Sequence, residues 1–491
     1  MLSDEQEAQE TTEKGIIDGK EVSRREFLKY AGVAGAAVGL SGGLGGLLAA
    51  CGGTTTTTAA SAATTTTAGT GSTTVTTAGS TTTVSSGPTP PTQDKIVIGA
   101  PRPVTGSLSA FEAGNWGPAY KLWTKDVNDA GGITVAGKKL PIELKIYDDQ
   151  SNLDTSMRLL TKLIEEDKVD FVMAPCSTAF LFAAAGVCNA KKYLLMSAEG
   201  GATTLEKEME KGNLPYFFQV LNYSDHYQTP TFTALMQELG MKTASVVYID
   251  DLHGIEYQAQ AQIFFSGAGI KILSNTAVPL DIKDVSSIIK KIQGENPDAV
   301  CFYVYPPINP LCAGAMLQIN YSPKCVLWGP TGASQWFYDA FKGALDGTMF
   351  EGAWSVHSTP TAQAYYDKLA AFVTPANVDF WGGLIYRGQL EAFQQSIEQA
   401  GTLDNTAVAA VLRKGHFKTS LTDDFFFDQD QILNQSSYSG QIGQWQKGIA
   451  EVIDAGKVRT ATPIYPKLGW ADAAKSAPST TTTAPATPPS S

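Results

Sequence analysis

The sequence predicts an α/β protein whose folded part consists of two doubly wound lobes. Short apolar segments alternate with segments of helical period from Lys95 onward. Strands that are almost entirely apolar and separated by helices are typical of parallel sheets covered on both faces. This pattern starts afresh near residue 225, and two lobes of about 120 residues fit it better than one open sheet of ten or more strands.

The elements follow one another in βαβ order. In the first lobe we expect a strand at 95–100, a helix at 115–129, a strand at 142–149, a helix at 154–167 and strands at 170–175 and 193–198. The helix at 154–167 is predicted because apolar residues recur along one face, namely Met157, Leu160, Leu163 and Ile164.

In the second lobe we expect helices at 225–240, 254–268, 284–294 and 311–320, alternating with strands at 244–250, 271–278, 299–304 and 325–330. The chain then continues through helices at 361–373 and 383–400 and strand-like segments near 425–427 and 441–445.

Composition excludes some classes of protein. The 491 residues include 36 basic and 48 acidic side chains, a formal charge of -12. This acidic balance argues against a nucleic-acid partner, since such partners favour basic surfaces. With 43% hydrophobic residues, the chain is globular and long enough for two to four domains.

The N-terminus predicts an export signal over residues 1–50. Arg24 and Arg25 precede Phe27-Leu28-Lys29, which resembles a twin-arginine signal, and the uncharged run that follows ends in LAAC at Cys51. LAAC resembles the box that is cut before a cysteine destined for acylation, so we expect a lipid on Cys51 that holds the protein on the outer face of the cytoplasmic membrane. The alternative, a transmembrane helix at 30–50, is disfavoured by the many glycines in this run.

Two segments contain too few apolar side chains to form a folded core. Residues 51–93 form a tether in which 19 of the 39 residues from Thr54 to Thr92 are threonine. Residues 471–491 form a similar Thr/Pro tail.

Motifs for catalysis or metal binding are incomplete. Residues 132–139 lack the Ser or Thr that ends a phosphate loop and follow a helix instead of a strand, so we expect a β-turn link. Asp148 and Asp154 have calcium-loop spacing, but Leu153 and Leu159 occupy the required Gly and Glu positions, which favours strand termination and helix capping. There is no H-E-x-x-H pair and no G-x-S-x-G elbow. We therefore expect no cofactor, no metal and no enzyme.

Five cysteines follow Cys51, an odd number for an exported chain. Cys176 and Cys188 bracket a helix and lie too far apart for a disulfide. One bridge is conceivable among Cys301, Cys312 and Cys325, but buried free thiols are the preferred interpretation.

The strand-edge motifs, in their order, carry a resemblance. IVIGAPRPVTGSLSAFEAGNWGPAYKLWTKDVNDAGGI, LPIELKIYDDQSN, LIEEDKVDFVMAPCSTA, DLHGIEY, FYVYPP, VLWGPTG, GTMFEGAW and GQIGQWQKG occur in sequence between Lys95 and Asp454. This order resembles the leucine/isoleucine/valine-binding protein family, the type I periplasmic solute receptors of ABC importers.

The resemblance implies a three-crossover hinge near 217–220, 349–354 and 441–445. It implies a first lobe of residues 94–218 plus 355–440 and a second of 219–350 plus 441–470. Ligand would be held in the cleft between them, at the carboxyl ends of the strands, and an ABC permease and ATPase would be the partners.

The resemblance also implies site residues in the first lobe. Ser177 and Thr178 match the family's carboxylate-binding position at a helix N-terminus, with simple N-capping as the alternative. The next loop matches the family in position but not in residue type, because Glu199 and Gly200 occupy positions where the family has uncharged residues. Phe111 and Trp116 match cleft-wall positions, with core packing as the alternative.

In the second lobe Tyr303 and Tyr305 match cleft-wall positions, with core packing as the alternative. His253 replaces the family's Tyr before Gly, and Thr331 replaces the acid that binds the ammonium group. Either Glu199 supplies the missing acid from the opposite lobe, or the ligand has no ammonium group. We therefore expect a branched-chain or hydrophobic amino acid or a related amide; a ligand-sensing receptor on the same fold and an extracellular hydrolase are the alternatives.

Overall fold

The computed structural model describes residues 14–17, 20–23, 89–201, 203–221, 227–352, 354–373, 378–438, 440–454, 459–470 and 472. The predicted Arg24, Arg25 and Cys51 lie outside the described residues. Strands β1 (Lys14–Ile17) and β2 (Lys20–Ser23) pair as an antiparallel hairpin ahead of the folded lobes.

The first lobe is built on parallel strands. In its three-stranded sheet, β3 (Ile96–Arg102) lies between β6 (Ile142–Asp148) and β7 (Phe171–Val172), and β8 (Leu195–Ser197) pairs in parallel with β9 (Phe217–Gln219). Its helices are α4 (Ser109–Phe111), a π-helical turn at Glu112–Trp116, α5 (Gly117–Asp129), α6 (Leu153–Glu165), α7 (Thr178–Lys191), α8 (Thr203–Glu210), α15 (Gly383–Ala400) and α16 (Asn405–Leu412).

The second lobe contains one seven-stranded sheet. Its order is β11 (Lys271–Val278), β10 (Thr243–Ile249), β12 (Ala299–Tyr303), β13 (Val326–Trp328), β14 (Met349–Glu351), β15 (Ile442–Gln446) and β16 (Ile449–Val452). The strands run parallel up to β14, and β15 and β16 are antiparallel.

Helices accompany this sheet. They are α9 (Thr229–Glu238), α10 (Leu252–Gly267), α11 (Ser286–Glu295), α12 (Ile308–Gln318) and α13 (Gln335–Phe341), with short 3-10 turns at Pro330–Ala333 and Lys342–Leu345. Helix α14 (Pro360–Phe372) packs on α5, and a further 3-10 turn covers Gln435–Ser437.

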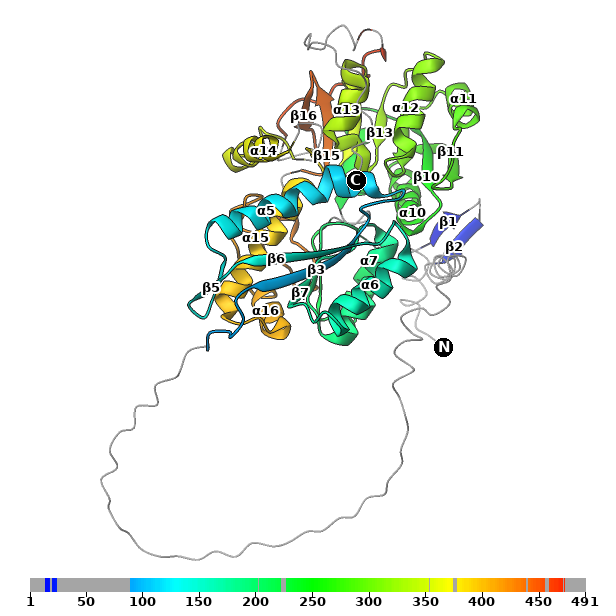
Figure 1. Cartoon of the computed structure of the whole chain (residues 1–491). Helices are drawn as coiled ribbons and strands as arrows, with labels where there is room; N and C mark the ends of the chain where they lie inside the picture. The colour runs from blue at the N-terminus through cyan, green and yellow to red at the C-terminus, as the bar shows by residue number, and fades with distance from the viewer. Residues whose placement is uncertain are drawn as a thin grey trace, which may run out of the picture.

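The chain passes between the lobes three times. It leaves the first lobe after β9, returns after β14 to form α15 and α16 against α5 and β8, and crosses again to add β15 to the second sheet. Figure 1 shows the two bodies, with β3, β6 and β7 in one and β10 to β16 in the other. The predicted fold class is therefore confirmed, whereas the residue limits proposed for each lobe stay a prediction.

Local sequence explains several element boundaries. Asn152 caps α6 by accepting from the Thr155 amide, as a helix-capping role for this segment predicts. Residues 133–140 form a hairpin, β4 (Ile133–Val135) and β5 (Lys138–Leu140), in agreement with a turn link and not a phosphate loop.

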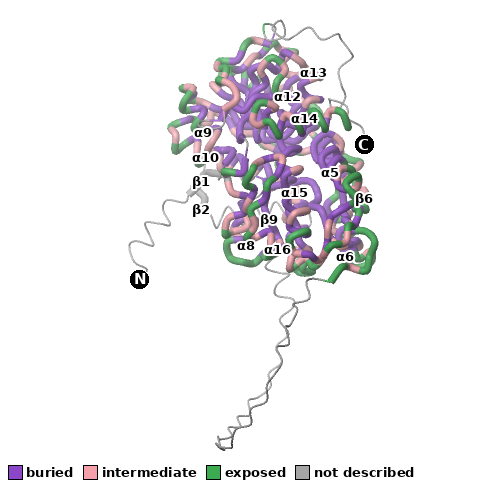
Figure 2. Tube along the Cα trace, turned by 90° about the vertical axis from the view of Figure 1, so that its left-hand side faces the viewer, coloured by how far each residue is buried: buried purple, intermediate pink, exposed green. Residues whose placement is uncertain are grey.

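Buried apolar side chains fill both lobes. In Figure 2 the buried trace runs through the interior of each lobe, and exposed segments lie at outer turns such as those around α6. All five cysteines of the described residues are free and buried, as the preferred interpretation has it. Within the described ranges, no helix has the length and apolar character needed to cross a membrane, and no cluster of three or more His, Cys, Asp or Glu side chains is arranged to hold a metal ion.

Candidate functional site

A pocket lies between the two lobes, and its space, counted together with the adjoining solvent, measures about 310 Å³. The first lobe contributes Phe111, Trp116, Ser177, Thr178, Glu199 and Gly200. The second contributes His253, Tyr257, Tyr305 and Pro330. Eight of the ten residues expected to bind ligand thus line one pocket, which we call the interlobe pocket.

One end of the interlobe pocket is the N-terminus of α7. Ser177 stands at the N-cap with a φ of 86°, a conformation uncommon for a residue with a side chain, and its side chain makes no capping hydrogen bond. The unpaired amides of the first helical turn and the helix dipole favour a negative group here.

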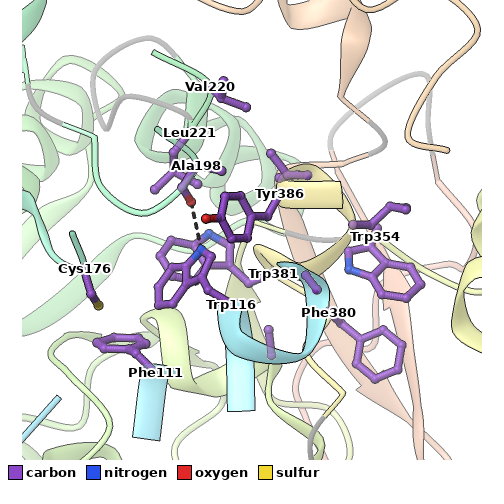
Figure 3. Packing of buried hydrophobic residues seen from close by; sticks show 14 of the residues in the cluster. Phe111, Trp116, Cys176, Ala198, Val220, Leu221, Trp354, Phe380, Trp381 and Tyr386 are labelled. Atoms are coloured by element: carbon purple, nitrogen blue, oxygen red, sulfur yellow. Dashed lines mark hydrogen bonds between the residues drawn. The ribbon is translucent and has the colours of Figure 1, made fainter. Parts of the chain in front are cut away.

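The wall of the pocket is aromatic. The ring of Trp116 lies 5.0 Å from Phe111 and 5.6 Å from Trp381, centroid to centroid, and Phe111 meets Tyr305 of the other lobe edge-on at 5.6 Å. Figure 3 shows the Trp116 indole nitrogen pointing to the carbonyl oxygen of Ala198, to which it donates over 3.2 Å. The hydrogen bond and the ring contacts thus fix the orientation of the Trp116 ring, and the wall presents ring faces and edges to a ligand.

His253 supplies a neutral polar group from the first turn of α10. Its ring stacks on Tyr305 at 5.1 Å and 26°, and only 5% of the residue is exposed. Burial lowers the pKa of His253 to about 3, so the imidazole is uncharged at neutral pH. Among the described residues, no side chain or backbone group bonds its Nε2.

Glu199 lines the pocket with its charge already paired. Nη1 of Arg102 donates to Glu199 Oε1 over 2.7 Å, and Nε of Arg102 donates to Glu112 Oε2 over 2.8 Å. Burial raises the pKa of Glu199 to about 7, and the guanidinium opposes this shift.

Tyr303 and Thr331 do not line the interlobe pocket. Tyr303 is buried in β12 with its ring 5.4 Å from that of Tyr257, and Thr331 is buried in the 3-10 turn after Pro330. Their role in ligand binding stays a prediction, as does that of the eight residues that do line the pocket.

Sequence reasoning missed Trp381, Tyr257 and Cys176, which also line the pocket. Trp381 comes from the segment before α15 and packs so closely on Gly352 that a Cβ there would lie 1.9 Å from its ring. Tyr257 follows His253 by one helical turn. That spacing was available in the sequence, whereas nothing local places Trp381 beside Trp116.

The two-lobed fold, with a pocket between its lobes, is that of a periplasmic binding protein. The periplasmic binding protein family matches residues 95–448, and the chain belongs to this family. A twin-arginine translocation signal matches residues 21–41, in agreement with the predicted export signal. The protein is therefore an exported periplasmic binding protein, and the predicted resemblance is confirmed.

Solved structures support the same fold. A solute-binding protein of an ABC transporter from Rhodopseudomonas palustris, in complex with 3,4-dihydroxybenzoic acid, has a TM-score of 0.63 at 18% identity, covering 76% of this chain and 99% of that one. The branched-chain amino acid binding protein LivJ from Streptococcus pneumoniae, in complex with isoleucine, has a TM-score of 0.62 at 17% identity, covering 74% and 100%. A second R. palustris protein, in complex with 4-hydroxybenzoate, has a TM-score of 0.63 at 16% identity, covering 74% and 98%.

Proposed function

We propose that this protein is the membrane-tethered receptor of an ABC importer and that it captures a small carboxylate with an aromatic body in the interlobe pocket. The observation that carries the ligand class is the pairing of Glu199 with Arg102. An α-amino acid needs an anionic partner for its ammonium group, and Glu199 is the one acid among the described residues that line the pocket.

The remaining features support an aromatic acid. The N-terminus of α7 suits the carboxylate, and the rings of Phe111, Trp116 and Tyr305 suit a flat apolar body. Two of the similar structures hold hydroxylated benzoic acids.

A branched-chain or hydrophobic amino acid, or a related amide, is the second candidate. The observation that favours this candidate is that a carboxylate, that of Glu199, lines the pocket. If an amino acid were bound, this carboxylate would interact with both Arg102 and the ammonium group of the ligand.

Calorimetric titration of the purified protein with 4-hydroxybenzoate, benzoate, isoleucine and isoleucinamide separates the two ligand classes. We expect the aromatic acids to bind and the amino acid to bind at least tenfold more weakly. Tight binding of isoleucine that is lost in Glu199→Gln would reverse the assignment. Hydrolysis of isoleucinamide to isoleucine and ammonia would favour a hydrolase instead.

Anchoring is proposed through a lipid on Cys51 of the exported protein. Cys51→Ala should move the protein from the membrane fraction to the soluble extracytoplasmic fraction, and it should abolish labelling by a radioactive fatty acid. Substitution of Arg24 and Arg25 by lysine should leave the protein unexported. Permease and ATPase subunits are the expected partners, and transport that depends on them would distinguish a receptor for import from a sensor.

A further inference from the structure

The segment that joins β8 to α8 forms part of the interlobe pocket and is tied to the first lobe. The Ser177 amide donates to the Glu199 carbonyl oxygen over 3.2 Å, and Gln219 Nε2 donates to that of Gly200 over 2.6 Å. A Cβ on Gly200 would lie 3.1 Å from the Thr178 nitrogen, so this backbone packs directly on the first turn of α7.

The second lobe holds the first turn of α8, which follows this segment in the chain. Glu256 of α10 accepts from the Thr203 amide over 3.0 Å, from the Thr204 amide over 3.1 Å and from the Thr204 hydroxyl over 2.5 Å. Only 2% of Glu256 is exposed. Its carboxylate thereby caps the N-terminus of α8, where free amides and the helix dipole favour an anion.

One face of α10 carries both this cap and the pocket wall. His253, Glu256 and Tyr257 stand at positions i, i+3 and i+4 of the helix and share a face. His253 and Tyr257 line the interlobe pocket, while Glu256 reaches beyond it to α8. Movement of α10 away from the first lobe would open the pocket and break the cap together.

We propose that Glu256 is a positioning residue that latches the two lobes in the closed form and holds the Gly200 wall of the pocket in place. The proposal rests on the proposed function, because it assigns a ligand-binding role to closure. The hydrogen bonds to this carboxylate form only when the lobes meet, so they favour the closed population before any ligand arrives. If these hydrogen bonds are removed, the closed fraction of the ligand-free protein falls. The apparent affinity for ligand then falls in proportion to that fraction.

The test compares Glu256→Ala with the wild-type protein by small-angle scattering without ligand and by binding kinetics with 4-hydroxybenzoate. We expect a larger radius of gyration without ligand and about 10- to 100-fold weaker binding, mainly through faster dissociation. Glu256→Gln, which keeps an acceptor oxygen but not the charge, should restore part of both effects. Thr204→Val removes one donor without changing the helix, and it should shift the scattering less in the same direction.

Glu295→Ala is the matched control. Glu295 Oε2 accepts from Ser245 over 2.7 Å and from Ser274 over 2.6 Å, two residues of its own lobe. We expect its loss to leave the ligand-free scattering unchanged. Unchanged scattering in both Glu256→Ala and Thr204→Val overturns the latch. Failure of 4-hydroxybenzoate to bind the wild-type protein overturns the proposed ligand class and leaves the scattering result to decide on the latch.

Discussion

Two buried polar regions, one within the first lobe and one between the lobes, lie side by side and differ in how their hydrogen bonds are used. In the cluster of Arg102, Glu112 and Glu199, opposite charges bond one another. In the adjoining pocket, His253 Nε2 has no partner among the described residues and Ser177 makes no capping bond. The charge cluster holds the pocket wall in place, whereas the polar groups of the pocket stay available to form hydrogen bonds with a ligand. Glu199 belongs to both, which explains how an acid can line the pocket without attracting a cation.

The largest expected effect comes from breaking the charge cluster. Arg102→Met leaves two buried carboxylates without their cation and should lower the free energy of unfolding by about 3–5 kcal/mol. Urea denaturation measures this loss. Adding Glu199→Gln should recover part of it.

The matched control for this substitution is Arg459→Met. Its partner Glu238 has a side chain that is 43% exposed, so this variant should lose less than about 1 kcal/mol. Equal losses in the two variants would show that burial does not govern the strength of the cluster.

Ligand affinity should depend on two polar groups of the interlobe pocket, the Ser177 hydroxyl and the His253 imidazole. Ser177→Ala and His253→Ala should each weaken binding of 4-hydroxybenzoate by about 1–3 kcal/mol, because each removes a buried hydrogen-bond partner of the guest. Calorimetric titration measures the change. Arg102→Met tests the difference between the two regions, because it should lower the free energy of unfolding more than it weakens ligand binding. Unchanged affinity in both pocket variants would remove the site assignment.

The pH dependence of stability should report the burial of His253. Its pKa in the folded state, about 3, lies below the ordinary value near 6.5. The unfolded chain therefore binds the proton first, and the stability present above pH 6.5 is lost as the pH falls. Relative to His253→Phe, the wild-type protein should lose about 1 kcal/mol between pH 7 and pH 5.5. Denaturation curves of both proteins at several pH values measure this difference, and parallel curves would contradict a buried neutral imidazole.

The sequence predicts most of the fold because the information is local. Strand β6 was expected at 142–149 and lies at Ile142–Asp148, and α15 was expected and found at 383–400. Apolar runs and helical spacing are enough for elements of this length. Short elements without such patterns, such as β16, escaped prediction.

The site was predicted only where a residue matches a motif at a strand edge. Ser177 and His253 directly follow expected strands or their loops, so the fold brings them to one cleft. The bond from Arg102 to Glu199 joins residues 97 positions apart. Trp381 enters the pocket through the return crossover. Such pairings depend on tertiary packing, and no local spacing encodes them.

The smallest effects are expected where predicted site residues lie beside the pocket. Tyr303→Phe and Thr331→Val remove hydroxyl groups that face neither the pocket nor, among the described residues, any hydrogen-bond partner. Because no bond is broken, affinity for 4-hydroxybenzoate should change by less than about 0.5 kcal/mol. Titration alongside Ser177→Ala measures both under the same conditions. A loss as large as that of Ser177→Ala would mean that the guest reaches past Pro330, and that the pocket in solution is wider than the closed form described above.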